Sequence, residues 1–337
     1  MCRISACRLE LKSRFAILNA IQFVFDQRCP NRFHRVVDEG ARSSIASIFI
    51  GPNGLRAGWR FLLFALAIEA GVFVIEEPLA QILARQFGIN PRELSASALW
   101  IGEFVFCLSV FLVTGIFALG EHRRIDSYGL PIEQAFGKFF WKGMLAGLLV
   151  VLFVAGAMIL SGAMVVHGLA LHGSDLVRLT LLWFVANILL GLSEEYTFRG
   201  YALQSLWQGA GFWPAALITT AIFAGDHLEK PGENAMDIGM IFFLAFILCL
   251  SVRRTGSLWW AVGWHAGFDF GQLFLVGTRN GGQTPVGRLF NVTFPGPAWL
   301  NGGELGTEAS IFMMPAAIAT SIYVVWFLRG LPPNEKR

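Results

Sequence analysis

The sequence has few charged residues. Only 15% of its 337 residues are Asp, Glu, Lys or Arg, whereas a soluble globular domain averages about 25%. The net charge of +3 excludes the strongly basic surface typical of nucleic-acid-binding proteins. The five cysteines form no C-x-x-C pair, so neither a disulfide framework nor a cysteine metal site is predicted. Hydrophobic residues make up 55% of the chain, which indicates an integral membrane protein.

Apolar segments follow one another from residue 60 onward. A membrane-spanning helix needs about 20 predominantly apolar residues. The predicted spans are residues 60–82, 95–119, 143–168, 178–203, 213–229, 236–252, 257–277 and 309–329, of which the fifth and sixth are short. The predicted fold is therefore all-α: a polytopic membrane helical bundle of about eight transmembrane helices over residues 51–337, with an intramembrane polar cavity.

The distribution of basic residues predicts the orientation. With eight spans, one side of the membrane receives the basic N-terminal segment and Arg123, Arg124, Lys138, Lys142, Arg253, Arg254, Arg329, Lys336 and Arg337. Cytoplasmic loops carry an excess of Lys and Arg. A multi-pass protein of the cell (plasma) membrane with both termini in the cytoplasm is predicted.

Two segments lie outside the spans. Residues 1–50 are basic and their apolar patch, residues 15–25, is too short to cross a membrane. A poorly ordered extension is favoured there over an amphipathic surface helix. Residues 278–307 are rich in Gly, Pro and Asn and are predicted to face outward, as a connector rather than a lid.

Two adjacent carboxylates and an arginine interrupt the fourth apolar segment. Ionisable groups within a membrane are costly and are usually functional. On a helix, Glu195 and Arg199 are four residues apart and share a face, where they can neutralise each other, whereas Glu194 is turned by about 100°. Glu194 is therefore left without a partner from its own helix.

Two further polar sets occur in the fifth and seventh spans. Phe223 and His227 share a helical face in the fifth span, and Asp226 stands beside the histidine. In the seventh span, His265 and Asp269 are four residues apart and therefore lie on one face. Each set alone has a structural explanation, such as a helix tie or a core histidine. Three successive sets on three helices are hard to explain in this way.

A row of glycines accompanies the third set. Gly263, Gly267 and Gly271 lie on nearly the opposite face of the seventh span from the polar pair. Small residues in such a row let another helix approach closely. This helix is expected to pack on its glycine side and to present His265 and Asp269 to an interior cavity.

In order, spacing and placement, the three sets resemble the motifs of the CPBP intramembrane proteases, the family of the eukaryotic CAAX prenyl endopeptidase and bacterial Abi-type proteins. The resemblance is carried by Glu-Glu-x-x-x-Arg at 194–199, Phe-x-x-x-His at 223–227 and His-x-x-x-Asp at 265–269. It covers a protease core at about residues 178–277. The third motif of this family ends in Asn or Asp, and the segment 56–60 before the first span also resembles bacterial members.

The resemblance implies hydrolysis of a peptide bond within the membrane. In this family the residues that match Glu194 and His227 hold and activate a water molecule, and those that match His265 and Asp269 polarise the carbonyl. Asp269 can donate a hydrogen bond only when protonated and would otherwise orient His265, so its role stays open. Supporting roles fall to Glu195, Arg199 and Phe223.

The use of a metal is a separate question. Two histidines and a carboxylate, His227, His265 and Glu194, could hold a zinc ion with one open position. The sequence has no His-Glu-x-x-His helix, the motif of many zinc proteases. Chemistry that requires no cofactor is favoured, and zinc stays an alternative.

The expected substrate is a membrane-associated peptide or protein, reached from the lipid bilayer, with no nucleic-acid partner. The alternative function is a non-enzymatic membrane immunity or scaffold protein of the same fold, in which the motifs only maintain the structure. A transporter would more often show an internal repeat, and none is found.

Overall fold

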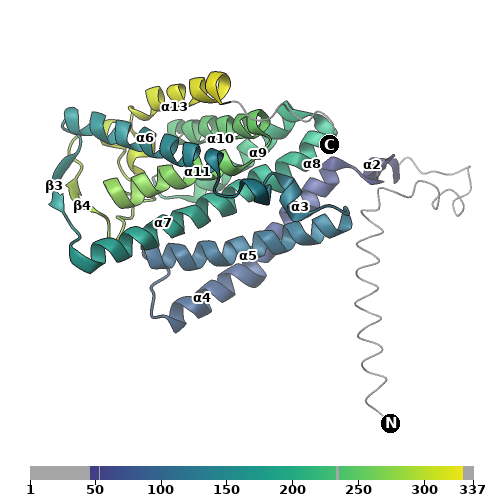
Figure 1. The fold of residues 1–337 in the computed structure, drawn as a ribbon, viewed down its shortest axis with the longest axis horizontal. Helices are drawn as coiled ribbons and strands as arrows, with labels where there is room; N and C mark the ends of the chain where they lie inside the picture. Colours follow the sequence, from purple (N-terminus) through teal and green to yellow (C-terminus); the bar gives the residue numbers. More distant parts are fainter. Residues whose placement is uncertain (1–45, 53, 233–234, 329–337) are drawn as a thin grey trace, which may run out of the picture.

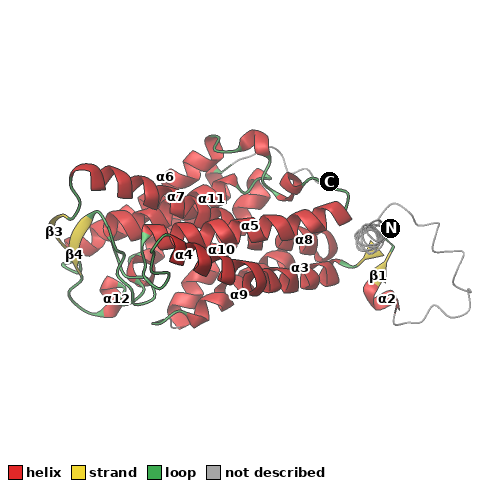
Figure 2. Ribbon diagram, turned by 90° about the horizontal axis from the view of Figure 1, so that it is seen from below, coloured by secondary structure: helices red, strands yellow, loops and turns green. Residues whose placement is uncertain are grey.

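The computed structural model describes residues 46–52, 54–232 and 235–328. The predicted N-terminal extension lies almost wholly outside the described residues, as do Arg329, Lys336 and Arg337. The described chain is an elongated bundle of helices (Figures 1 and 2). This confirms the predicted all-α membrane architecture.

The main helices follow the order of the predicted spans. They are α3 (Ala57–Gly71), α4 (Glu77–Gln86), α5 (Ala96–Gly120), α6 (Lys138–Leu160), α7 (Gly173–Glu195), α8 (Leu203–Ala210), α9 (Phe212–Asp226), α10 (Ala235–Thr255), α11 (Trp259–Asp269) and α13 (Met313–Ile322). Wider π-helical turns extend several of them: η2 (Val72–Glu76), η5 (Tyr196–Ala202), η7 (Phe270–Val276) and η9 (Tyr323–Phe327).

Short elements complete the described chain. They are α2 (Ala46–Phe49), β1 (Ile50–Gly51), β2 (Gly54–Leu55), η3 (Ile125–Tyr128), η4 (Ile132–Gln134), β3 (Val165–Leu169), η6 (His227–Glu229), β4 (Phe290–Thr293), α12 (Ala298–Asn301) and η8 (Gly306–Ala309). β3 and β4 pair antiparallel at one end of the bundle, and α2 and α8 lie at the other (Figure 1).

Within the described residues, five helical stretches are long and apolar enough to cross a membrane. They are Ala57–Gln86, Ala96–Gly120, Lys138–Leu160, Gly173–Ala210 and Ala235–Thr255. Met313–Phe327 is apolar but shorter, and α9 and α11 also fall below the length of a full span. The structure thus establishes a multi-pass bundle, and the count of eight stays a prediction.

The third predicted span ends earlier than the apolar run. α6 stops at Leu160, and Gly162 adopts a φ of +76°. A left-handed residue there ends the helix, and glycine adopts this conformation without a steric cost. Residues 165–169 then form β3, where His167 Nε2 lies 2.8 Å from Thr293 Oγ1 of β4. The predicted connector, residues 278–307, contributes β4 and α12 to this end of the bundle.

α11 lies between α6 and α7 (Figure 1) and meets α6 through reciprocal glycines. A Cβ atom added at Gly263 or Gly267 would lie 2.1 Å from a backbone oxygen of α6. One added at Gly143 or Gly147 of α6 would lie 2.1 or 2.0 Å from a backbone oxygen of α11. The predicted role of the glycine row is confirmed, and the contact fixes the helix that carries His265.

A buried carboxylate ties four elements together at the α8 end. Glu121 Oε1 accepts hydrogen bonds from Arg60 Nη1 at 3.0 Å and from the Tyr201 hydroxyl at 2.6 Å. Its Oε2 accepts one from the Tyr128 hydroxyl at 2.9 Å. Burial raises the pKa of Tyr128 above its ordinary value, so this hydroxyl stays a donor. We call Arg60, Glu121, Tyr128 and Tyr201 the Glu121 cluster.

Candidate active site

The first motif lies where α7 passes into a wider helical turn. Glu194 and Glu195 end α7, and η5 follows, with a kink at Gly200 where ψ is −114°. Single π-helical turns within helices are frequent at functional sites. The side chain of Glu194 is 24% exposed, whereas that of Glu195 is fully buried, so the two neighbouring carboxylates have different surroundings.

Glu195 and Arg199 form the predicted pair. Arg199 Nη1 lies 3.2 Å from Glu195 Oε1, and both side chains are fully buried. Arg199 Nη2 also donates to the backbone oxygen of Ala245 on α10 at 3.3 Å. The pair therefore fixes the end of α7 against α10, which confirms the contact inferred from helical spacing.

His265 is surrounded by carboxylates. Its Nδ1 lies 3.0 Å from Glu195 Oε1, and its Nε2 lies 3.2 Å from Asp269 Oδ2 and 3.5 Å from Glu194 Oε2. The predicted proximity of His265 and Asp269 is confirmed, and the contact with Glu195 links the first and third motifs. Ionised carboxylates only accept hydrogen bonds, so a ring protonated on both nitrogens fits these surroundings.

Phe223 is the apolar centre of the site. The guanidinium carbon of Arg199 lies 4.4 Å from the centroid of its ring, which is a cation–π contact. Its ring centroid is 4.7 Å from that of His227 and 6.4 Å from that of His265. The Phe223 ring thus lies between residues of all three motifs.

The backbone sets the tautomer of His227. Its Nδ1 lies 2.9 Å from the backbone oxygen of Phe223, one turn earlier. A carbonyl oxygen can only accept, so Nδ1 carries the hydrogen. In the neutral ring Nε2 is then an acceptor, and it is suited to hold a water molecule or take a proton.

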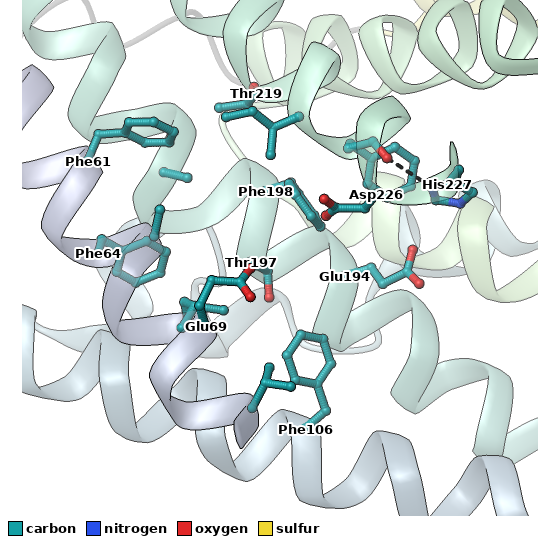
Figure 3. Close-up of a pocket in the computed structure, with 16 residues that line it drawn as sticks. Phe61, Phe64, Glu69, Phe106, Glu194, Thr197, Phe198, Thr219, Asp226 and His227 are labelled. Carbon is teal, nitrogen blue, oxygen red and sulfur yellow. Dashed lines mark hydrogen bonds between the residues drawn. The ribbon is translucent and has the colours of Figure 1, made fainter. Parts of the chain in front are cut away.

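Glu194 and His227 line the same cavity (Figure 3). This cavity has a volume of about 250 Å³, lies between α3, α5, α7–η5 and α9, and also receives Asp226. Most of its wall is apolar, including Phe61, Ile68 and Phe106. Two polar groups that could activate water therefore face a cavity suited to an apolar ligand.

All seven predicted site residues converge. Six are joined by the contacts above, and His227 is joined through Phe223 and the shared cavity. Further enclosed carboxylates were not predicted. They include Glu121, and Glu103 on α5, which is partly buried and whose Oε2 lies 2.6 Å from Ser193 Oγ. An ionisable residue inside an apolar run is a recognisable signal, and it applies to Glu103.

The proposed zinc ligands do not form a metal site in this arrangement. Among the described residues, no group of three or more His, Cys, Asp or Glu side chains has the geometry to hold a metal ion. Both ring nitrogens of His265 face carboxylate oxygens, which suits a protonated donor better than a metal ligand. His227 donates through Nδ1 to the backbone, and this bond leaves its Nε2 able to bind an ion.

A known family model matches part of the chain. Residues 176–271 match the Rce1-like family model, described as type II CAAX prenyl endopeptidase Rce1-like. This segment contains all three motifs and confirms the resemblance predicted from them. The match covers less than a third of the chain, and no curated protein matches.

Proposed function

We propose, from the membership of residues 176–271 in the Rce1-like family of membrane proteases, that this chain is an intramembrane endopeptidase that hydrolyses a peptide bond with activated water. The observation that carries the proposal is that Glu194 and His227, whose Nδ1 is bonded to the backbone, line one largely apolar cavity. The two residues come from different helical elements, α7 and η6.

The chemistry follows from the positions of the donors and acceptors. A water molecule between Glu194 and His227 Nε2 loses a proton to Glu194, and its oxygen attacks the carbonyl carbon. His265, doubly protonated, keeps its Nδ1–H on Glu195 and turns its Nε2–H from Asp269 to the developing oxyanion. Glu194 then passes its proton to the leaving nitrogen as the carbon–nitrogen bond breaks. Glu195 and Arg199 keep these groups in place.

The proposed substrate is a membrane-associated peptide or protein. The wall that α3 and α5 contribute to the cavity is mostly apolar, and it includes one carboxylate among the described residues, Glu69 of α3. Such a wall binds an apolar residue or chain next to the scissile bond by removing it from water. A soluble, highly charged peptide would gain little from it.

We propose that the α8 end of the bundle faces the cytoplasm of a plasma-membrane protein. The ends of helices at that end carry Arg56, Arg123, Arg124, Lys138, Lys142, Arg253 and Arg254. Positive residues favour the cytoplasmic side. Both termini lie on that side in the eight-span topology.

We propose that the reaction uses no metal ion, because His265 serves as a donor between carboxylates rather than as a ligand. Purified protein is expected to contain less than one zinc per chain and to keep its activity after treatment with a chelator. Elemental analysis of wild type and His227→Ala tests this. One zinc per chain, lost together with activity in the variant, would overturn it.

Protein termini in membranes provide the test of protease function. Cells expressing wild type or Glu194→Gln at matched abundance are compared, with Glu133→Gln, an exposed carboxylate on η4, as the control. Termini that appear with wild type and Glu133→Gln, but fall by about 10²–10⁴-fold with Glu194→Gln, are expected. They would also identify the substrates.

The opposite result has a clear meaning. Identical termini from wild type and Glu194→Gln, with both proteins folded, would contradict the protease proposal. An unchanged biological effect of Glu194→Gln would then favour the immunity or scaffold function.

A further inference from the structure

Glu103 is a partly buried carboxylate that the proposed reaction does not use. It lies on α5, inside an apolar stretch, and its Oε2 is 2.6 Å from Ser193 Oγ. Ser193 is fully buried and directly precedes Glu194. Glu103 also interacts electrostatically with Glu194. A second carboxylate is thus attached to the turn that carries the proposed general base.

The hydrogen bonds of Ser193 indicate where the proton lies. Its Oγ is 2.6 Å from Glu103 Oε2 and 2.9 Å from the backbone oxygen of Leu190. A hydroxyl has one hydrogen, and a carbonyl oxygen can only accept. If Ser193 donates to Leu190, the hydrogen between Ser193 and Glu103 must come from Glu103. A protonated Glu103 satisfies both contacts, whereas an ionised one satisfies only one.

The charges around Glu103 favour the same assignment. Glu76 of η2 and Glu194 of α7 are carboxylates that interact with Glu103, His265 of α11 is an opposing group, and the Cys107 thiol of α5 is a further titratable neighbour. Ionised neighbours of like charge disfavour a further negative charge. A cleft of about 340 Å³, lined by Glu76, Glu77 and Gly102 among others, lies next to this part of α5.

We propose that Glu103 is a proton-bearing positioning residue for Glu194. Its hydrogen bond to Ser193 ties the last turn of α7 to α5 without placing a second negative charge beside Glu194. Loss of the proton would turn the Ser193 hydroxyl away from Leu190 and add that charge. The consequence for catalysis rests on the proposed function, whereas the proton on Glu103 does not.

Infrared difference spectroscopy of the full chain in lipid nanodiscs tests the proton directly. At neutral pH, wild type is expected to show a carbonyl band of a protonated carboxyl that is missing in Glu103→Gln. Ser193→Ala should shift this band, because it removes the hydrogen-bond partner, and Glu133→Gln should leave it unchanged. Identical spectra of wild type and Glu103→Gln in this region would overturn the proposal.

Activity tests the positioning role. With a peptide derived from a terminus that depends on wild type, Glu103→Ala is expected to lower kcat about tenfold with little change in KM, the effect of losing one buried hydrogen bond. Glu103→Gln should recover most of this loss, because an amide donates the same bond, and should lack the decline at high pH that ionisation of Glu103 causes in wild type. Equal losses in both variants, with the same pH profile as wild type, would overturn this role.

The two proposals fail in different ways. If wild type produces no termini, the protease function fails while the infrared band still reports on Glu103. If termini are produced but the band is missing, the function stands and Glu103 is not the proton carrier.

Discussion

The Glu121 cluster can be compared with the Glu194 site, which consists of Glu194, Glu195, Arg199, His265 and Asp269. Both are polar groups on neighbouring elements, and they differ in how completely their atoms are hydrogen-bonded. In the Glu121 cluster, one carboxylate faces Arg60 and two hydroxyl donors, so both of its oxygens are hydrogen-bonded. Arg60 Nε is its unpaired atom among the described residues. Charge and hydrogen bonds nearly balance there, as in a structural tie.

The Glu194 site has an excess of acceptors. Glu194, Glu195 and Asp269 face one imidazole and one guanidinium, and Glu195 Oε2 lacks a hydrogen-bond partner among the described residues. Unpaired buried polar atoms cost free energy. Such a cost is expected where a ligand or water completes the site. The completeness of hydrogen bonding, more than burial, distinguishes the structural Glu121 cluster from the proposed active site.

Replacing Glu by Gln should lower stability but not activity in the Glu121 cluster, and activity but not stability at Glu194. Glu121→Gln leaves Arg60 buried without an opposite charge, so the free energy of unfolding should fall by about 3–5 kcal/mol. Activity per folded molecule should persist, since the cluster does not reach the cavity. Denaturant titration in mixed micelles and the termini assay measure the two quantities.

Glu194→Gln is the matched control for this comparison. It should remove activity while leaving the unfolding transition nearly unchanged, because Glu194 is partly exposed to the cavity. If Glu121→Gln instead abolished activity in a fully stable protein, the distinction between the two groups would be wrong.

The sequence was informative where contacts are local. Helical periodicity placed Glu195 with Arg199, Phe223 with His227 and His265 with Asp269, because residues four apart lie on one face. The glycine row likewise predicted a close helix contact on α11. These inferences need only the geometry of one helix, and each is confirmed.

Contacts between distant segments could not be derived in the same way. The bond between His265 and Glu195 joins residues 70 apart in sequence and depends on how α11 packs between α6 and α7. Glu121 lies at the end of its apolar run, where a charged residue is ordinary. The early end of α6 was also missed, because the apolar sequence continues past Gly162 whereas the helix ends at Leu160.

The smallest expected effect concerns one donor of the Glu121 cluster. Tyr128→Phe keeps the ring beneath Arg123, whose guanidinium carbon lies 4.4 Å from the ring centroid, and removes the hydroxyl that donates to Glu121. The free energy of unfolding should fall by about 1 kcal/mol at neutral pH, because Tyr201 and Arg60 still bond to Glu121.

The difference in stability between wild type and Tyr128→Phe should depend on pH, because burial raises the pKa of Tyr128 in the folded wild-type protein. Above about pH 10, the ordinary pKa of tyrosine, the unfolded chain ionises first. The stability that Tyr128 contributes is therefore complete below that pH and is lost as pH rises further. Unfolding measured in micelles at rising pH should show the difference between wild type and Tyr128→Phe shrinking above pH 10. A difference that stayed constant across this range would mean that the hydroxyl is not held as a neutral donor, and the Glu121 cluster would then be less completely paired than its geometry indicates.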